Sequence, residues 1–241
     1  MAQPVAPDFH LLCAGAAKGL VLALQADFER AAGVRLQARF GAVGAMRDEL
    51  AAGAPCDVFV ATEAMVRSLA ASGALDARST APIGRVQTAI AVRADAPRPA
   101  IESADALRST LLAAAALHIP DATRSTAGAH VVAVLERLAI RDALAPRLVM
   151  HPNGATAMRA LAATTEPRAL GCTQATEIRY TPGLALVGPL PPPCALATVY
   201  SAAVCVRAHH VDAAHDFVTL LAGPTSAALR LGGGFDPLSA S

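Results

Sequence analysis

The sequence has no tryptophan, two tyrosines and six phenylalanines, so aromatic residues make up only 3% of its 241 residues. Charged residues are also scarce, at 16%, and their signs nearly cancel to a formal net charge of +1. Nucleic-acid-binding proteins usually offer a basic patch to the phosphates or a row of aromatic rings to the bases. Because this sequence contains neither pattern, we expect no nucleic-acid partner.

Long apolar runs are missing as well. Hydrophobic residues make up 54% of the chain, but no stretch reaches the roughly 18 uninterrupted apolar residues that a transmembrane helix needs. We therefore expect no direct membrane insertion, and a globular protein of one or two domains. The first residues contain no Lys or Arg before Lys18 and do not form a recognisable signal peptide. The chain as it stands is predicted to be cytoplasmic, or periplasmic if a signal has been removed.

The five cysteines are odd in number, widely spaced and free of CxxC pairs. This pattern predicts buried free thiols and mildly favours a reducing compartment. His209, His210 and His215 flank the start of a predicted helix, but their surroundings do not supply the set of partners that a zinc site needs. We predict no metal site and no cofactor.

Residues 9–60 organise the chain and show the pattern of a βαβαβ unit. The first helix is predicted over 17–32, with apolar residues at Leu20, Leu24 and Phe28 and a glycine stop after it. The second helix is expected to begin after Gly44. Since parallel strands deliver their loops to the same edge of a sheet, the small-residue loops 13–18 and 41–44 should lie side by side.

A helix N-terminus that follows such a loop is a receptor for a small anion, because its first backbone N–H groups are unpaired and its dipole is positive there. A second α/β region, which begins near residue 85, repeats the pattern. There a predicted strand, a small polar loop and a helix follow one another around Ser125 to Gly128. Further along, 170–174 is a predicted strand that ends in Gln174, and two helices over 212–221 and 225–231 close the chain.

Three segments resemble the type II periplasmic solute-binding proteins, in particular the molybdate-binding branch. They are CAGAAKG before the first helix, DFERAAGVRLQARFGAVGAMRDELAAGAPCDVF, and LLAGPTSAALRLGGGFDP near the end. The resemblance implies an α/β fold of two lobes, each a doubly wound and mostly parallel sheet, joined by a hinge of two crossing strands. Residues 1–84 and 201–241 would form lobe 1 and residues 85–200 lobe 2, with the ligand in a cleft that closes by hinge motion.

The resemblance also implies a set of ligand-binding positions, at which this sequence departs from the molybdate binders. Where those proteins use two serine hydroxyls, this chain has Ala16 and Val43, and Gln174 replaces a tyrosine. Each lost charge-assisted hydrogen bond is worth about 1.5–3 kcal/mol, so we expect an organic carboxylate rather than molybdate. The predicted ligand-binding residues are Ala14, Gly15, Ala16, Ala17, Lys18, Gly41, Ala42, Val43, Gly44, Ser125, Thr126, Ala127, Gly128, Asn153 and Gln174.

Some polar residues have two interpretations. Lys18 and His130 lie in the first turns of predicted helices, where a solvated or capping role competes with ligand contact. Glu177 and Arg179, which follow Gln174, would either line the cleft or cap their segment.

The sequence supports two principal hypotheses about function. The first is a protein that binds a small anion and, if exported, presents it to a membrane transporter. The second follows from the resemblance, because relatives of the molybdate branch include isomerases of unsaturated di- and tricarboxylates. Such an enzyme needs a base, for which His130 is the candidate, and backbone donors that stabilise an enolate-like intermediate. A ligand sensor is a third class, for which no positive feature was found.

Overall fold

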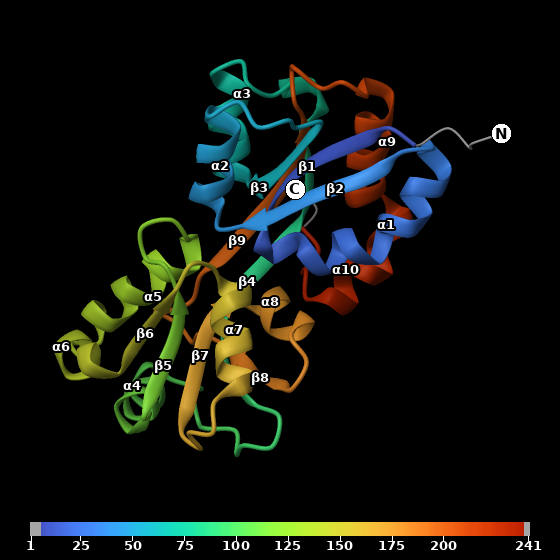
Figure 1. The fold of residues 1–241 in the computed structure, drawn as a ribbon. Helices are drawn as coiled ribbons and strands as arrows, with labels where there is room; N and C mark the ends of the chain where they lie inside the picture. The colour runs from blue at the N-terminus through green and yellow to red at the C-terminus, as the bar shows by residue number, and fades with distance from the viewer. Residues whose placement is uncertain (1–5, 239–241) are drawn as a thin grey trace. The chain divides into compact units, whose positions relative to one another are not determined.

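The computed structural model describes residues 6–238, and the chain divides into two compact units. Unit 1 comprises the chain up to Arg85 and from Val199 onward, and unit 2 comprises the segment between them. The chain leaves unit 1 within β4 (Ala81–Arg93) and returns to it within β9 (Ala197–Val204). The last two helices therefore belong to the same unit as the first strands (Figure 1).

Unit 1 has three parallel strands, since β1 pairs in parallel with both β2 and β3, and β9 adds to β3 in the antiparallel direction. This arrangement confirms the βαβαβ unit that the first sixty residues predict. Its elements are β1 (Asp8–Ala14), η1 (Gly15–Ala17), α1 (Lys18–Ala32), β2 (Arg35–Gly41), α2 (Val43–Ala51), β3 (Val58–Thr62), α3 (Glu63–Ala71), η2 (Ala77–Ser79), α9 (Val211–Ala222), η4 (Pro224–Ser226) and α10 (Ala227–Gly233).

The core of unit 1 includes an aromatic cluster between the sheet and its helices. Phe9 on β1 lies 4.9 Å from Phe28 on α1 and 5.8 Å from Phe217 on α9, measured between ring centroids. All three rings are at least 97% buried. Figure 1 shows α1, α9 and α10 together on one side of the unit and α2 and α3 on the other. Helix α1 ends as predicted, at Gly33 in the left-handed conformation (φ 66°).

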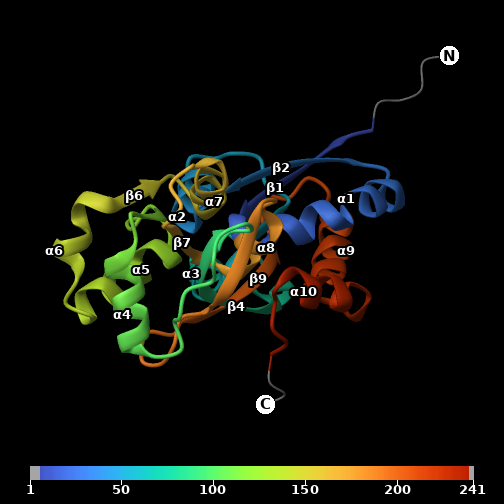
Figure 2. The ribbon, with the colours of Figure 1, turned by 90° about the horizontal axis from the view of Figure 1, so that it is seen from below.

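Unit 2 also has a parallel centre, because β5 pairs in parallel with β6 and β7, while β4 runs antiparallel to β7 and β8. Figure 2 shows α4, α5 and α6 grouped together around this part of the chain. Its remaining elements are α4 (Ala104–Ala113), β5 (Ala116–Pro120), α5 (Thr126–Arg137), α6 (Arg141–Leu144), η3 (Ala145–Arg147), β6 (Leu148–His151), α7 (Gly154–Ala163), β7 (Ala169–Gln174), α8 (Ala175–Tyr180) and β8 (Leu184–Pro189).

The α/β fold class predicted from the sequence is confirmed, with corrections to individual elements. Helix α2 begins at Val43, before the predicted start after Gly44, so both residues belong to its first turn rather than to the loop. The short elements α6, β6 and α8 were not predicted. None of the described helices is both long and apolar enough to cross a membrane.

Candidate functional site

The two predicted loops of unit 1 lie at neighbouring strand ends. Ala14, the last residue of β1, is the parallel partner of Gly41, the last residue of β2. The 3₁₀ turn η1 and helix α1 follow the first strand, and α2 follows the second after Ala42. The structure therefore brings together the candidate residues 14–18 and 41–44, as expected for consecutive βα connections.

The helices that start at these loops have no side-chain cap, a property that they share with α6, α8 and α10. Their N-cap residues are alanines, Ala17 for α1 and Ala42 for α2, which have no side-chain hydrogen-bond acceptor. Helix α9 has no side-chain cap either, but the Asp57 carboxylate accepts hydrogen bonds from the backbone N–H groups of His209 and His210 just before it. The helices that do have side-chain caps are α3 (Thr62), α4 (Ser103), α5 (Ser125) and α7 (Asn153).

The side chains around the unit 1 loops are small and mostly buried. Ala16 is 4% exposed and Val43 is 8% exposed. Because both side chains are aliphatic, neither position offers a hydroxyl to a ligand. The Lys18 ammonium group lies 5.5 Å from the centroid of the Phe40 ring, a cation–π contact at the end of β2. The predicted ligand donors in unit 1 are thus backbone N–H groups, with one cation close by.

In unit 2, the α5 loop is built around a close backbone approach. The Ser125 hydroxyl accepts a bond from the Gly128 N–H at 3.4 Å. A Cβ atom on Gly128 would overlap the backbone carbonyl oxygens of Pro120 and Asp121. A side chain larger than that of glycine at position 128 would therefore disturb the packing of α5 against the end of β5.

Two other predicted residues already have partners in the protein. The His130 Nε2 atom lies 2.8 Å from the carbonyl oxygen of Cys194, so Nε2 carries the proton and donates it. The Asn153 Oδ1 atom accepts bonds from the N–H and the hydroxyl of Thr156. The basic nitrogen left on neutral His130 is Nδ1, and the Asn153 side-chain oxygen serves as the α7 cap.

Gln174 is different, because its side chain is 98% buried and neither of its amide atoms has a hydrogen-bond partner within the described part of the chain. Directly opposite it in the antiparallel β4–β7 pair is Thr88, whose buried hydroxyl also lacks a partner there. Residues opposite each other in such a pair lie on the same face of the sheet. The Thr176 hydroxyl, two residues further on, is buried and unpaired too. Buried polar groups normally have partners, so this cluster indicates a place where a ligand or water binds.

Beside Gln174, the buried carboxylate of Glu177 has several partners. Thr173 donates its hydroxyl to Glu177 Oε2 at 2.5 Å, and the backbone N–H groups of Gln174 and Ala155 also donate to this carboxylate. Burial raises the pKa of Glu177 to about 6, although these hydrogen bonds act in the opposite direction. The sequence suggested a lining or capping role for Glu177 but did not indicate that Thr173 would donate a hydrogen bond to it.

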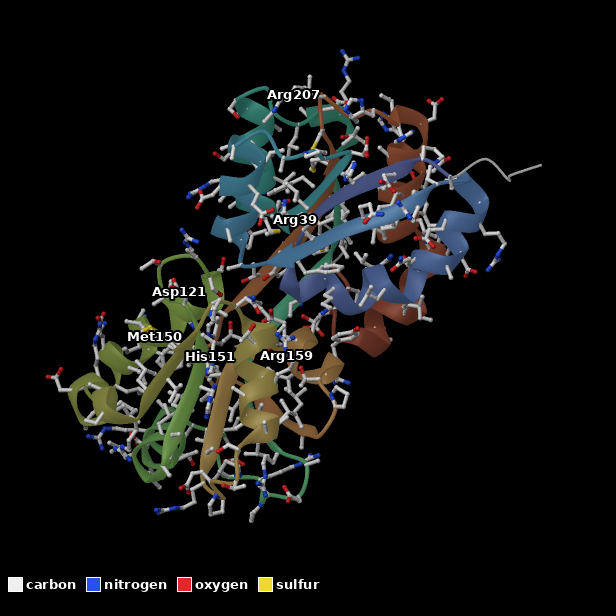
Figure 3. All side chains as sticks on the ribbon, viewed as in Figure 1. Arg39, Asp121, Met150, His151, Arg159 and Arg207 are labelled. Atoms are coloured by element: carbon white, nitrogen blue, oxygen red, sulfur yellow. The ribbon has the colours of Figure 1, made fainter. Side chains whose placement is uncertain are left out.

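A pair of titratable side chains lies on the neighbouring strands β5 and β6. The ring nitrogens of His118 and His151 are 3.0 Å apart, and burial lowers the pKa of both side chains. The Asp121 backbone N–H donates to the His151 carbonyl oxygen, and Figure 3 shows Asp121 and His151 close together. The sequence alone does not indicate this pair, because its two members are 33 residues apart.

Two of the cysteines adjoin these groups, since Cys172 precedes Thr173 on β7 and the Cys194 carbonyl oxygen accepts the His130 bond, whereas His209 and His210 lie at the start of α9 in unit 1. The backbone N–H groups of His209 and His210 donate to the Asp57 carboxylate, and the described residues contain no group of three potential metal ligands. All five cysteines are buried, unpaired thiols. A pocket of about 670 Å³ in unit 1 lies at the start of β3, near Cys56, rather than at the loops that follow β1 and β2.

Comparison with known proteins agrees with this architecture. A family model described as bacterial extracellular solute-binding protein matches residues 9–236. Aconitate isomerase of Pseudomonas sp. is 29% identical, over 99% of this chain and 91% of its own length. The periplasmic molybdate-binding protein of Azotobacter vinelandii is 18% identical with a TM-score of 0.79, covering 96% of this chain and 100% of that one.

The sulfate-binding protein of Mycobacterium tuberculosis has a TM-score of 0.72 at 18% identity, over 97% of this chain and 88% of its own. At such identities the two solved structures establish the fold alone. The family model, in contrast, spans almost the whole sequence and includes the strand ends, the uncapped helices and the Gln174 segment. This chain belongs to the bacterial extracellular solute-binding proteins.

Proposed function

We propose that this protein binds a small organic di- or tricarboxylate. The observation that carries the proposal is the pair of uncapped helices, α1 and α2, that follow the adjacent strand ends Ala14 and Gly41. Their first N–H groups and their dipoles favour an anion. Within unit 2, considered by itself, the buried and unpaired Gln174 amide supports binding of a polar ligand group.

A carboxylate fits these residues better than a tetrahedral metal oxyanion. Ala16 and Val43 provide none of the hydroxyls that the resemblance to molybdate binders calls for. Backbone donors and an amide, in contrast, suit a carboxylate with further polar substituents. The 29% identity to an aconitate isomerase supports an unsaturated tricarboxylate as the first ligand to test. If the protein is exported, the partner that we propose is a membrane transporter.

Isomerisation of such an acid is the second candidate, favoured by the same relative. The reaction removes a proton from a carbon next to a carboxylate and returns a proton to the other end of the allylic system, so composition is unchanged. His130 is the proposed base, acting through Nδ1 because Nε2 donates to Cys194. Backbone N–H groups at helix starts would stabilise the enolate-like intermediate.

A thermal-shift screen tests the binding proposal. Cis- and trans-aconitate, citrate and malate are compared with molybdate and sulfate, since a ligand at 100 times its Kd adds about 2.7 kcal/mol to the folded state. We expect stabilisation by at least one carboxylate and none by molybdate. The Gln174→Ala variant should lose most of the shift, whereas Gln25→Ala, in the middle of α1, should keep it. Stabilisation by molybdate alone would contradict the proposal.

A further inference from the structure

The N-terminus of α7 already holds a carboxylate from the protein itself. Glu177 accepts bonds from the Ala155 N–H in the first turn of α7 and from the Gln174 N–H at the end of β7. Gly154, the first residue of α7, makes room for it, since a Cβ atom there would overlap the Glu177 carboxylate and the Thr173 hydroxyl. A negative charge is thus built into the same segment that contains the unpaired Gln174 amide.

Within residues 6–238, no cationic side chain is among the groups that influence this carboxylate. The influences on its pKa are burial and hydrogen bonds, and no charged side chain is among them. Strand β8, which packs against α8, carries no titratable residue. The titratable groups on α8 and on the elements around it are Arg179 and Tyr180 on α8, Arg159 on α7, Cys172 on β7, His118 on β5, His151 on β6, Arg85 and Arg93 on β4, and His130, Glu136 and Arg137 on α5.

We propose that Glu177 couples anion binding at the Gln174 segment to the uptake of one proton. This inference rests on the proposed carboxylate ligand, and it adds a determinant of which ligand charge is accepted there. A ligand carboxylate near Gln174 repels ionised Glu177, so the bound complex favours the protonated form. Protonated Glu177 retains lone pairs that accept the bonds from the Thr173, Gln174 and Ala155 donors.

The size of the coupling follows from the separation of the charges. The Glu177 carboxylate is hydrogen-bonded to the Gln174 backbone, so a ligand group bound to the Gln174 amide lies within about 8 Å of it. At about 8 Å and an effective dielectric constant of about 20, two unit charges change a binding constant by roughly 30-fold. We expect the affinity for a polycarboxylate to rise roughly tenfold as the pH falls from 7.5 to 5.5. The rise is smaller than the full 30-fold because Glu177 changes only partly from its ionised to its protonated form over this range.

Titration calorimetry with trans-aconitate measures this coupling directly. Binding is recorded at pH 5.5, 6.5 and 7.5 in buffers of different ionisation enthalpy, which gives the number of protons taken up. We compare wild type with Glu177→Gln, which carries no charge, and with Glu102→Gln, which removes an exposed carboxylate of unit 2. Protonation of the ligand itself is common to all three proteins and cancels in the comparison.

We expect wild type and Glu102→Gln to take up about 0.7 of a proton at pH 6.5 beyond any taken up by Glu177→Gln. Glu177→Gln should bind with a nearly constant affinity over this range. Equal uptake in all three proteins would overturn the role of Glu177 while leaving carboxylate binding intact. If Glu177→Gln does not fold, wild type decides, because binding without proton uptake refutes the inference. If no carboxylate binds wild type at any pH, the proposed function fails as well.

Discussion

The Nδ1 atom of His118 lies 3.0 Å from the Nε2 atom of His151, and the two rings are inclined by only 18°. At this distance one imidazole donates an N–H···N hydrogen bond and the other accepts it. The bond requires that the accepting ring stays neutral, and a proton added to either ring places a charge in a half-buried position. This geometry agrees with the lowered pKa of both side chains, for which burial is the largest cause.

This pair should make the protein less stable at mildly acidic pH. Because the folded-state pKa values lie below the unfolded value of about 6.5, the unfolded chain binds more protons as the pH falls. Stability that is present above pH ~6.5 is therefore lost as the pH decreases toward the folded pKa values, by at most about 1.4 kcal/mol per pH unit and proton. Urea denaturation at pH 5.5, 6.5 and 7.5 measures this slope.

The matched variant for this test is His151→Gln, which keeps a hydrogen-bonding side chain but does not titrate. We expect a flatter dependence of the free energy of unfolding on pH than in wild type. Glu177 acts in the opposite direction, since its raised pKa makes stability fall as the pH increases from about 4.5 to about 6. Glu177 is present in both proteins and contributes equally to both. Identical slopes of the free energy of unfolding against pH would therefore contradict the role of the histidine pair.

The contact between Gly154 and Glu177 gives a second stability test. In Gly154→Ala the new methyl group overlaps the Glu177 carboxylate and the Thr173 hydroxyl, so we expect a loss of about 1–3 kcal/mol. Gly232→Ala in helix α10 is the control, because a Cβ atom there meets nothing within 4 Å. That variant should gain about 0.5–1 kcal/mol. A neutral Gly154→Ala variant would show that Glu177 moves away at no cost.

Much of the fold could be predicted because its long elements carry strong local signals. Leu20, Leu24 and Phe28 are buried along one face of α1, and Gly33 adopts the left-handed conformation that ends it. Helix α6 and strand β6 have four residues each and α8 has six. So few residues do not show a periodicity that distinguishes them from loops.

The candidate site was predictable only in part, for a related reason. The loops after β1 and β2 follow from local pattern and from the rule that parallel strands share an edge. The environment of Glu177 depends on Ala155 and Gly154, which are more than twenty positions earlier in the sequence. Such non-local contacts have no signature in a short window, and the same holds for the bond between His130 and Cys194.

Serines at positions 16 and 43, as the resemblance to the molybdate binders calls for, should change which anion the protein prefers. The double variant Ala16→Ser, Val43→Ser supplies two hydroxyls at the uncapped helix starts, each worth about 1.5–3 kcal/mol when bonded to an anion. We expect molybdate or sulfate to stabilise this variant in a thermal-shift assay but not wild type. Ala51→Ser adds a hydroxyl at an exposed position of α2 and should respond like wild type. An unchanged response of the double variant would mean that positions 16 and 43 do not contact the ligand.

The two roles available to His130 can be separated by one pair of variants. Its Nε2 donates to the Cys194 carbonyl oxygen at 2.8 Å, a bond that the amide of glutamine can replace but alanine cannot. His130→Ala should therefore lose about 0.5–1.5 kcal/mol of stability, while His130→Gln stays close to wild type.

Neither variant has a basic nitrogen in place of Nδ1. If His130 is the base of an isomerase, both should lower the kcat for interconversion of cis- and trans-aconitate by about 10²–10⁴-fold with little change in ligand affinity. Full activity of His130→Gln would assign His130 to structure alone, and a wild-type protein that binds aconitate without converting it would leave only the binding function.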